Sequence, residues 1–301
     1  MSLEPENALD LMQRLKGIVD LPSGSSDDVV WSIAKNYQKI RLKAKDPSLV
    51  QAAKKIAIRA IIERTLHQLG PTRMPMVNRR IEYSPGEEGE IDVPGTLDNV
   101  HSIDSIDSKS IILERKELKH IACVLMIDAS LSMTGEKLAM ATSSIAVLAH
   151  RLKGIEYAVI LFENRSTVIK NMDSEADLEK LIGDLLDLNA MGYTNIEEGL
   201  RAGIIELEKA KTTNKIGIIV TDGNYTMGHD PRQLASVFPK LHVVMTTGLD
   251  AREDICSGMA QKGKGKMYEI KNYEEMPGVL YSIIKTFHLR LHQRGGLNER
   301  M

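Results

Sequence analysis

The chain has 301 residues, enough for one large domain or two modest ones, and we expect two. Its 39 Lys and Arg residues nearly balance 41 Asp and Glu residues, so neither nucleic acid nor an anionic membrane is favoured as a partner. The two cysteines, Cys123 and Cys256, offer neither a disulfide framework nor a cysteine-based zinc site. The N-terminus lacks a signal-peptide core and no apolar run approaches the roughly 20 residues of a membrane span, so we expect a cytoplasmic protein.

Residues 1–75 carry two apolar stripes at helical spacing and are predicted to form a small helical region. Asp46-Pro47 is a start signal for the second helix, and Gly70-Pro71 is a stop signal. The first stripe consists of Val29, Val30, Ile33, Tyr37 and Ile40. The second stripe consists of Ala53, Ile56, Ala57, Ala60, Ile61 and Leu66.

Residues 76–118 form a connector in which turn signals separate short β-type pieces. Between Glu82 and Asp107 there are eight acidic residues and no Lys or Arg. Two interpretations stay open. The segment is either a solvated acidic loop or a docking strip for a basic surface of a partner.

Residues 119–287 alternate between apolar runs and helical segments, which predicts a doubly wound α/β fold with a mostly parallel sheet. The runs have the length and β-branched content of strands that are buried on both faces. They cover residues 120–128, 155–162, 215–222 and 241–247, with a last strand near 266–270. Helices are predicted at 136–152, 174–186, 196–210, 231–238, 252–262 and 274–287. We expect the tail, residues 288–301, to be frayed.

Oxygen-bearing side chains follow several of these strands, where an open parallel sheet binds its ligands. The first strand ends in a carboxylate and two hydroxyls on one turn, and the third ends in Thr-Asp-Gly. The loop before the helix at 196–210 supplies a third hydroxyl. The candidate metal ligands are therefore Asp128, Ser130, Ser132, Thr194 and Asp222.

Two carboxylates and three hydroxyls make a hard oxygen site, which suits Mg²⁺, with Mn²⁺ or Ca²⁺ as alternatives. This set leaves a coordination position open, and the metal keeps positive charge, so an Asp or Glu of a protein partner can complete the site. The rival interpretation is a metal-dependent hydrolase of phosphate esters, against which stands the lack of a clear general base. Each motif alone is an ordinary helix cap or turn; their combination favours the metal site.

The pattern Asp-x-Ser-x-Ser, Gly-x-Thr and Thr-Asp-Gly resembles the metal-ion-dependent adhesion site of von Willebrand factor A domains, and residues 120–287 follow the order of elements in that family. The resemblance implies a non-catalytic binding module. It makes Ser130 and Ser132 direct ligands, and lets Thr194 coordinate directly or through water. Leu131 departs from the family pattern, in which many members have Gly there.

The segments Gly89–Leu97 and Ile111–Glu117 resemble the lead-in of intracellular A-domain proteins that work with AAA+ ATPases. Those include the D-type subunit of magnesium chelatase and the partners of MoxR-type ATPases. The sequence has no Gly-x-x-x-x-Gly-Lys-Ser/Thr motif, so the ATPase partner is expected to be a separate chain. The resemblance thus implies an adaptor in complex assembly or in metal or cofactor insertion.

Overall fold

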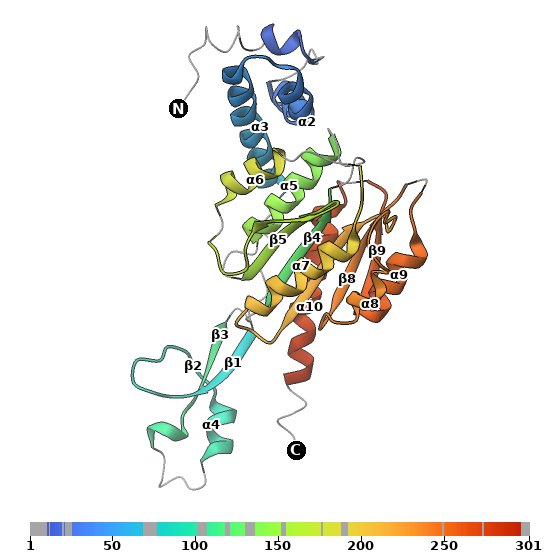
Figure 1. Cartoon of the computed structure of the whole chain (residues 1–301). Coiled ribbons are helices and arrows are strands. Elements are labelled where there is room, and N and C mark those ends of the chain that lie inside the picture. The colour runs from blue at the N-terminus through green and yellow to red at the C-terminus, as the bar shows by residue number, and fades with distance from the viewer. Residues whose placement is uncertain are drawn as a thin grey trace. The chain divides into compact units, whose positions relative to one another are not determined.

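A computed structural model describes residues 11, 13–19, 21, 26–68, 77–100, 107–117, 121–129, 136–151, 155–175, 177–187, 192–248, 250–272 and 274–295. The chain forms two compact units (Figure 1). The first contains Met1–Thr72 and Ile121–Ile283, and the second contains Arg73–His120 and Ile284–Met301.

A six-stranded sheet with the order β6-β5-β4-β7-β8-β9 organises the first unit. The strands are β4 Ala122–Asp128, β5 Glu156–Phe162, β6 Ser166–Lys170, β7 Lys215–Thr221, β8 Leu241–Thr246 and β9 Lys264–Ile270. All neighbours pair in parallel except β6, which is antiparallel to β5. The prediction of a doubly wound, mostly parallel sheet is confirmed. Strand β6 was not predicted, because it is a five-residue edge strand that buries only Lys170.

The flanking helices are α5 Glu136–Arg151, α6 Leu178–Leu186, α7 Ile196–Lys209, α8 Arg232–Ala235, α9 Glu253–Lys262 and α10 Met276–Gly295. Helices α7, α8 and α9 share an apolar core with one face of the sheet. Helix α5 and the part of α10 that belongs to this unit, Met276–Ile283, lie behind the sheet in Figure 1. Helix α6 begins later than predicted because Asp177 caps it by accepting the Lys180 amide at 3.0 Å. Helix α8 is shorter than predicted, and α10 continues to Gly295.

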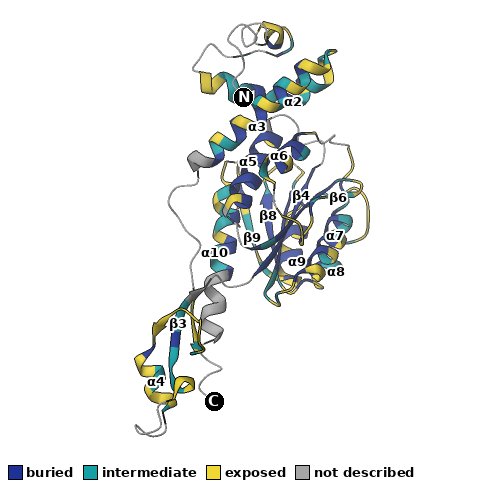
Figure 2. Cartoon of the chain, turned by 90° about the vertical axis from the view of Figure 1, so that its left-hand side faces the viewer, coloured by how far each residue is buried: buried dark blue, intermediate teal, exposed yellow. Residues whose placement is uncertain are grey.

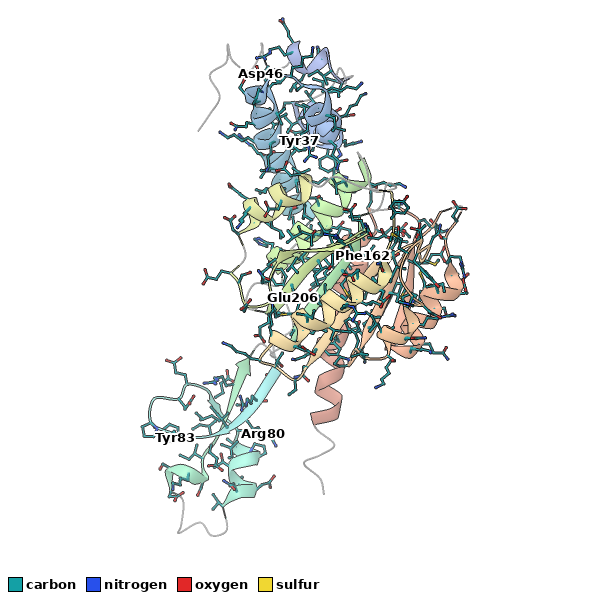
Figure 3. The ribbon with its side chains drawn as sticks, in the orientation of Figure 1. Tyr37, Asp46, Arg80, Tyr83, Phe162 and Glu206 are labelled. Atoms are coloured by element: carbon teal, nitrogen blue, oxygen red, sulfur yellow. The ribbon has the colours of Figure 1, made fainter. Side chains whose placement is uncertain are left out.

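Two glycines let α7 approach the sheet closely. A Cβ atom on Gly199 would lie 2.5 Å from the Phe162 ring, and one on Gly203 would lie 2.4 Å from the sulfur of Met126. Phe162 is fully buried at the end of β5 (Figure 3). This contact fixes the start of α7 at the carboxyl ends of β4 and β5.

The N-terminal helices, α2 Ser26–Lys43 and α3 Pro47–Gln68, pack on each other and on α5 and α6. Their shared core contains Ile33, Tyr37 and Ile61 together with Ala146 and Ile182. The predicted helical N-terminal region is confirmed. No helix in the described ranges is long and apolar enough to cross a membrane.

The second unit contains a three-stranded antiparallel sheet with the order β1-β3-β2. Its strands are β1 Val77–Glu82, β2 Glu90–Ile91 and β3 Ile112–Glu117. Helix α4, Val93–Asn99, follows β2 directly, and a short 3-10 helix, Ser108–Ser110, precedes β3. One of the turn signals predicted in residues 76–118, Ser84-Pro85-Gly86, lies between β1 and β2, where Gly86 has a φ of 99°.

Candidate metal site

Asp128 is the last residue of β4, the strand that lies between β5 and β7. The pairing of Ile127 with Val220 places Thr221, the last residue of β7, beside it. The Thr221 hydroxyl donates a hydrogen bond to Oδ2 of Asp128 at 2.9 Å, and both residues are buried. The neighbouring strand thereby orients the Asp128 carboxylate.

Asp222 follows β7 in a turn whose backbone is fixed from two sides. Its Oδ1 accepts the Asn224 amide at 2.9 Å, and its carbonyl accepts the Arg252 amide at 2.7 Å. Gly223 has a φ of 81°, and a Cβ atom there would lie 2.6 Å from the Arg252 carbonyl oxygen. Glycine is therefore required next to the second carboxylate.

Thr194 lies just before α7 and is buried. Its amide donates to the Thr226 hydroxyl at 3.0 Å, and its carbonyl accepts the Thr226 amide at 2.9 Å. The Asn195 amide donates to the Glu163 carbonyl at 2.7 Å, directly after β5. The Thr194 segment is thus held on one side by a residue that follows β5 and on the other by a residue that follows β7. Because β4 lies between these two strands, the segment crosses the end of β4.

Ser130, Leu131 and Ser132 lie outside the described residues, so their roles remain predictions. Ala129 is the last described residue after β4, and its amide donates to the Phe162 carbonyl at 2.8 Å. The structure thus brings Asp128, Thr194 and Asp222 to one edge of the sheet and leaves the two serines untested.

The thiol of Cys256 is buried beneath this edge and contacts the Thr221 carbonyl at 4.0 Å. Burial, and next the negative charges of Asp222, Asp254 and Asp128, raise the pKa of this thiol to about 12. Without a bound metal ion, the Cys256 thiol is therefore neutral at pH 7.

The donor chemistry at this edge fits a hard divalent cation. The carboxylates of Asp128 and Asp222 and the hydroxyl-bearing Thr194 lie at this edge, and within the described ranges no group of three or more His, Cys, Asp or Glu residues competes for a metal. Oxygen donors of this kind suit Mg²⁺ and disfavour softer metals. Asp128, Thr194 and Asp222 can hold such an ion, whose chemistry is to attract and bind an anionic oxygen.

Sequence reasoning missed two residues that organise the edge, Thr221 and Thr226. Each acts through a hydrogen bond to a residue far away in the chain, Asp128 and Thr194 respectively. The signal for Thr221 was its place as a hydroxyl at the end of a buried strand. Thr226 gave no comparable signal.

The loop after β7 is also tied to the first turn of α7. The His229 amide and ring Nδ1 lie 2.8 and 2.9 Å from Oε2 of Glu197, and Arg201 pairs with the same carboxylate at 2.8 Å. The His229 backbone hydrogen bond, followed by its side chain, lowers the pKa of Glu197. Glu197 is therefore a charged structural bridge and a weak proton acceptor.

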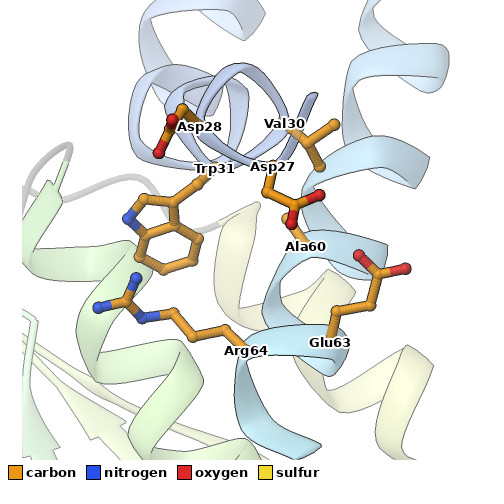
Figure 4. Close-up of a pocket in the computed structure, with 7 residues that line it drawn as sticks. All are labelled: Asp27, Asp28, Val30, Trp31, Ala60, Glu63 and Arg64. Atoms are coloured by element: carbon orange, nitrogen blue, oxygen red, sulfur yellow. The ribbon is translucent and has the colours of Figure 1, made fainter. Parts of the chain in front are cut away.

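A hollow of about 440 Å³ between α2 and α3 is a separate feature (Figure 4). The Arg64 guanidinium lies 4.4 Å from the centre of the Trp31 ring there. Glu63, on the same wall, is paired with Arg59 at 2.9 Å. The stacked pair joins α2 to α3. Asp128, Thr194 and Asp222 do not line this hollow.

Residues 123–224 match the family model of the von Willebrand factor type A domain. The six-stranded sheet and its covering helices have the von Willebrand factor A fold. Asp128, Thr194 and Asp222 all lie within the matched residues.

An uncharacterized protein of Synechocystis sp. is 28% identical over 158 residues, covering 50% of this chain and 38% of that protein. The chain therefore matches well under half the length of this curated relative. The structure of BatB from Bacteroides thetaiotaomicron is similar at 16% identity and a TM-score of 0.47, covering 56% of this chain and 98% of that one. Proximal thread matrix protein 1 from mussel byssus, solved with a zinc-occupied adhesion motif, gives 16% identity and a TM-score of 0.49, covering 57% of this chain and 46% of that one.

Proposed function

We propose that the chain is a non-catalytic, metal-dependent adaptor that binds a protein partner through Mg²⁺. The ion is held by Asp128, Ser130, Ser132, Thr194 and Asp222, and an Asp or Glu of the partner completes its coordination. The observation that carries the proposal is the convergence of Asp128, Thr194 and Asp222 on one edge of the sheet through the bonds of Thr221 and Thr226. An ion held partly by neutral hydroxyls keeps the positive charge that attracts a carboxylate.

Binding is favoured over hydrolysis of phosphate esters because the acidic groups already accept hydrogen bonds from the protein. Asp128, Asp222 and Glu197 each accept hydrogen bonds from neighbouring protein groups. At Glu197 these bonds lower the pKa, which makes this group a poor proton acceptor. A ligand-binding role requires only the oriented oxygens.

We further propose that the partner is a separate AAA+ ATPase and that the pair acts in the cytoplasm, in complex assembly or in metal or cofactor insertion. The support is the resemblance of Gly89–Leu97 and Ile111–Glu117 to the lead-in of A-domain proteins that work with such ATPases. The two free thiols, Cys123 and Cys256, fit a reducing compartment.

Affinity capture with the full chain tests this proposal. In the presence of Mg²⁺ the wild type and the exposed-site control Glu208→Ala are expected to retain an AAA+ ATPase, identified by mass spectrometry. EDTA and the variant Asp222→Ala are expected to release it, with the fold of the variant verified by circular dichroism. Retention of the same ATPase by Asp222→Ala, or in EDTA, contradicts the proposal.

A further inference from the structure

In the second unit, a stretch of seven residues contains three large apolar side chains that are exposed to solvent. Ile91, Val93 and Leu97 are 61%, 57% and 65% exposed. Val93 and Leu97 are four residues apart in α4 and therefore lie on the same side of the helix. These three residues are called the apolar patch below.

Polar bonds, and not apolar packing, hold the helix that carries the patch. Asp92 caps α4 by accepting the Gly95 amide at 3.1 Å, and Arg80 pairs with its Oδ2 at 2.6 Å. The Thr96 hydroxyl accepts the Ile112 amide of β3 at 2.9 Å. Helix α4 buries none of its residues, and Figure 2 shows it largely in the colours of exposed and intermediate side chains. The helix is thus fixed to the sheet while its apolar side chains face solvent.

The segment of the second unit that carries the patch, residues 77–117, buries few apolar side chains of its own. Among the described residues of 77–117, Leu113 is the only buried apolar residue. A unit of this size normally uses its large apolar side chains for its core. Apolar side chains that are held outward instead are typical of a surface that a partner covers.

The surroundings of the patch are acidic. Glu88, Glu90 and Asp98 are exposed beside it, and no Lys or Arg occurs from Glu82 to Asp107. Of the basic residues on the neighbouring strands, Arg80 and Arg115 are paired with Asp92 and Glu87. A complementary surface therefore has an apolar centre and a basic border.

We propose that the exposed face of β2 and α4 is a docking surface for a protein partner that presents an apolar contact bordered by Lys or Arg. This contact is separate from the metal site and requires no metal. It supplies a second point of attachment, so two weak contacts can act together on one partner or assembly.

Peptide binding to the full chain tests this surface. The probe is an amphipathic helical peptide of Leu and Lys, and a peptide of the same pattern with Glu in place of Lys is its control. We expect the Leu/Lys peptide to bind the wild type in EDTA and to protect the amides of residues 90–99 from hydrogen exchange. The paired variant Ile91→Ser with Leu97→Ser should weaken binding by roughly tenfold or more, because two apolar contacts are lost.

The matched control is Leu42→Ser, which removes a leucine that is 79% exposed on α2, in the other unit. It should bind the peptide as the wild type does. Because all the substituted side chains are exposed, the variants should keep the wild-type circular dichroism spectrum.

Each other outcome overturns the proposal. It is wrong if the peptide fails to bind, if the paired variant binds as tightly as the wild type, or if protection falls outside residues 90–99. It is also wrong if the wild-type mass rises with concentration in light scattering and the paired variant stays monomeric, because a second copy of the chain then covers the patch.

Discussion

At the scale of residues, the candidate metal site depends on hydroxyl groups that orient acidic or backbone groups. Thr221 donates to Asp128 across 93 positions of sequence, and the same Thr221 oxygen accepts the Gly223 amide at 3.1 Å. One buried hydroxyl therefore links the end of β4 to the turn that carries Asp222. Removing it should disturb both carboxylates at once.

Thr221→Val keeps the side-chain shape and removes the hydroxyl. It leaves a buried carboxylate with one donor fewer and the Gly223 amide without its acceptor, so unfolding should cost about 1–3 kcal/mol less than in the wild type. Mg²⁺ affinity should fall as well. Urea unfolding and calorimetric titration measure the two effects. Thr246→Val, at the end of the parallel strand β8, is the matched control and should change neither. Unaltered Mg²⁺ binding by Thr221→Val would show that this hydroxyl does not prepare the site.

The Glu197 bridge gives a pH dependence with a definite sign. Its pKa is lowered in the folded protein, first by the backbone hydrogen bond of His229, so its stabilising effect is complete above the ordinary glutamate pKa and is lost as the pH falls through the lowered value. The free energy of unfolding of the wild type should exceed that of Glu197→Gln at about pH 7, and the difference should shrink below about pH 4. Urea unfolding of both proteins at the two pH values checks this. A difference that stays constant or grows in acid contradicts the assignment.

At the scale of elements, the end of α6 is one of the places where the N-terminal helices attach to the sheet domain, beside their packing on α5. Asp187 accepts the Tyr37 hydroxyl at 3.0 Å and pairs with Lys54 at 2.6 Å. Tyr37 is fully buried, and burial, followed by this hydrogen bond, raises its pKa. The attachment thus combines the buried Tyr37 side chain with the ion pair between Asp187 and Lys54.

Asp187→Ala should destabilise the attachment by about 1–3 kcal/mol, because the buried Tyr37 hydroxyl loses its acceptor. The amides of α2 and α3 should exchange faster, while those of β4 and β7 should not. Hydrogen exchange with mass spectrometry provides the test, with Asp184→Ala on the same helix as control. Equal protection of α2 in the two variants would mean that apolar packing alone holds the N-terminal helices.

At the scale of the whole molecule, the sequence predicts what repeats locally and misses what depends on distant partners. The runs that became β4, β5 and β7 were recognisable because they are apolar along their whole length, and Asp128 and Asp222 followed from their strand ends. Strand β6 was not predicted because it is a short edge strand in which polar and apolar residues are mixed. Thr226 positions Thr194 through a hydrogen bond, and another hydrogen bond fixes α4 to the sheet with its apolar side chains exposed. The spacing of residues in the sequence does not reveal either bond.

The central claim is that Asp128, Thr194 and Asp222 belong to one Mg²⁺ site, and a calorimetric titration of the full chain with Mg²⁺ tests it most directly. The wild type and the exposed-site control Glu208→Ala are predicted to bind one ion with the same affinity. Asp128→Ala and Thr194→Ala, if folded by circular dichroism, should each bind at least about tenfold more weakly, a change of roughly 1.4 kcal/mol. Mg²⁺ binding that is equally tight in both variants, or no binding by the wild type, contradicts the account.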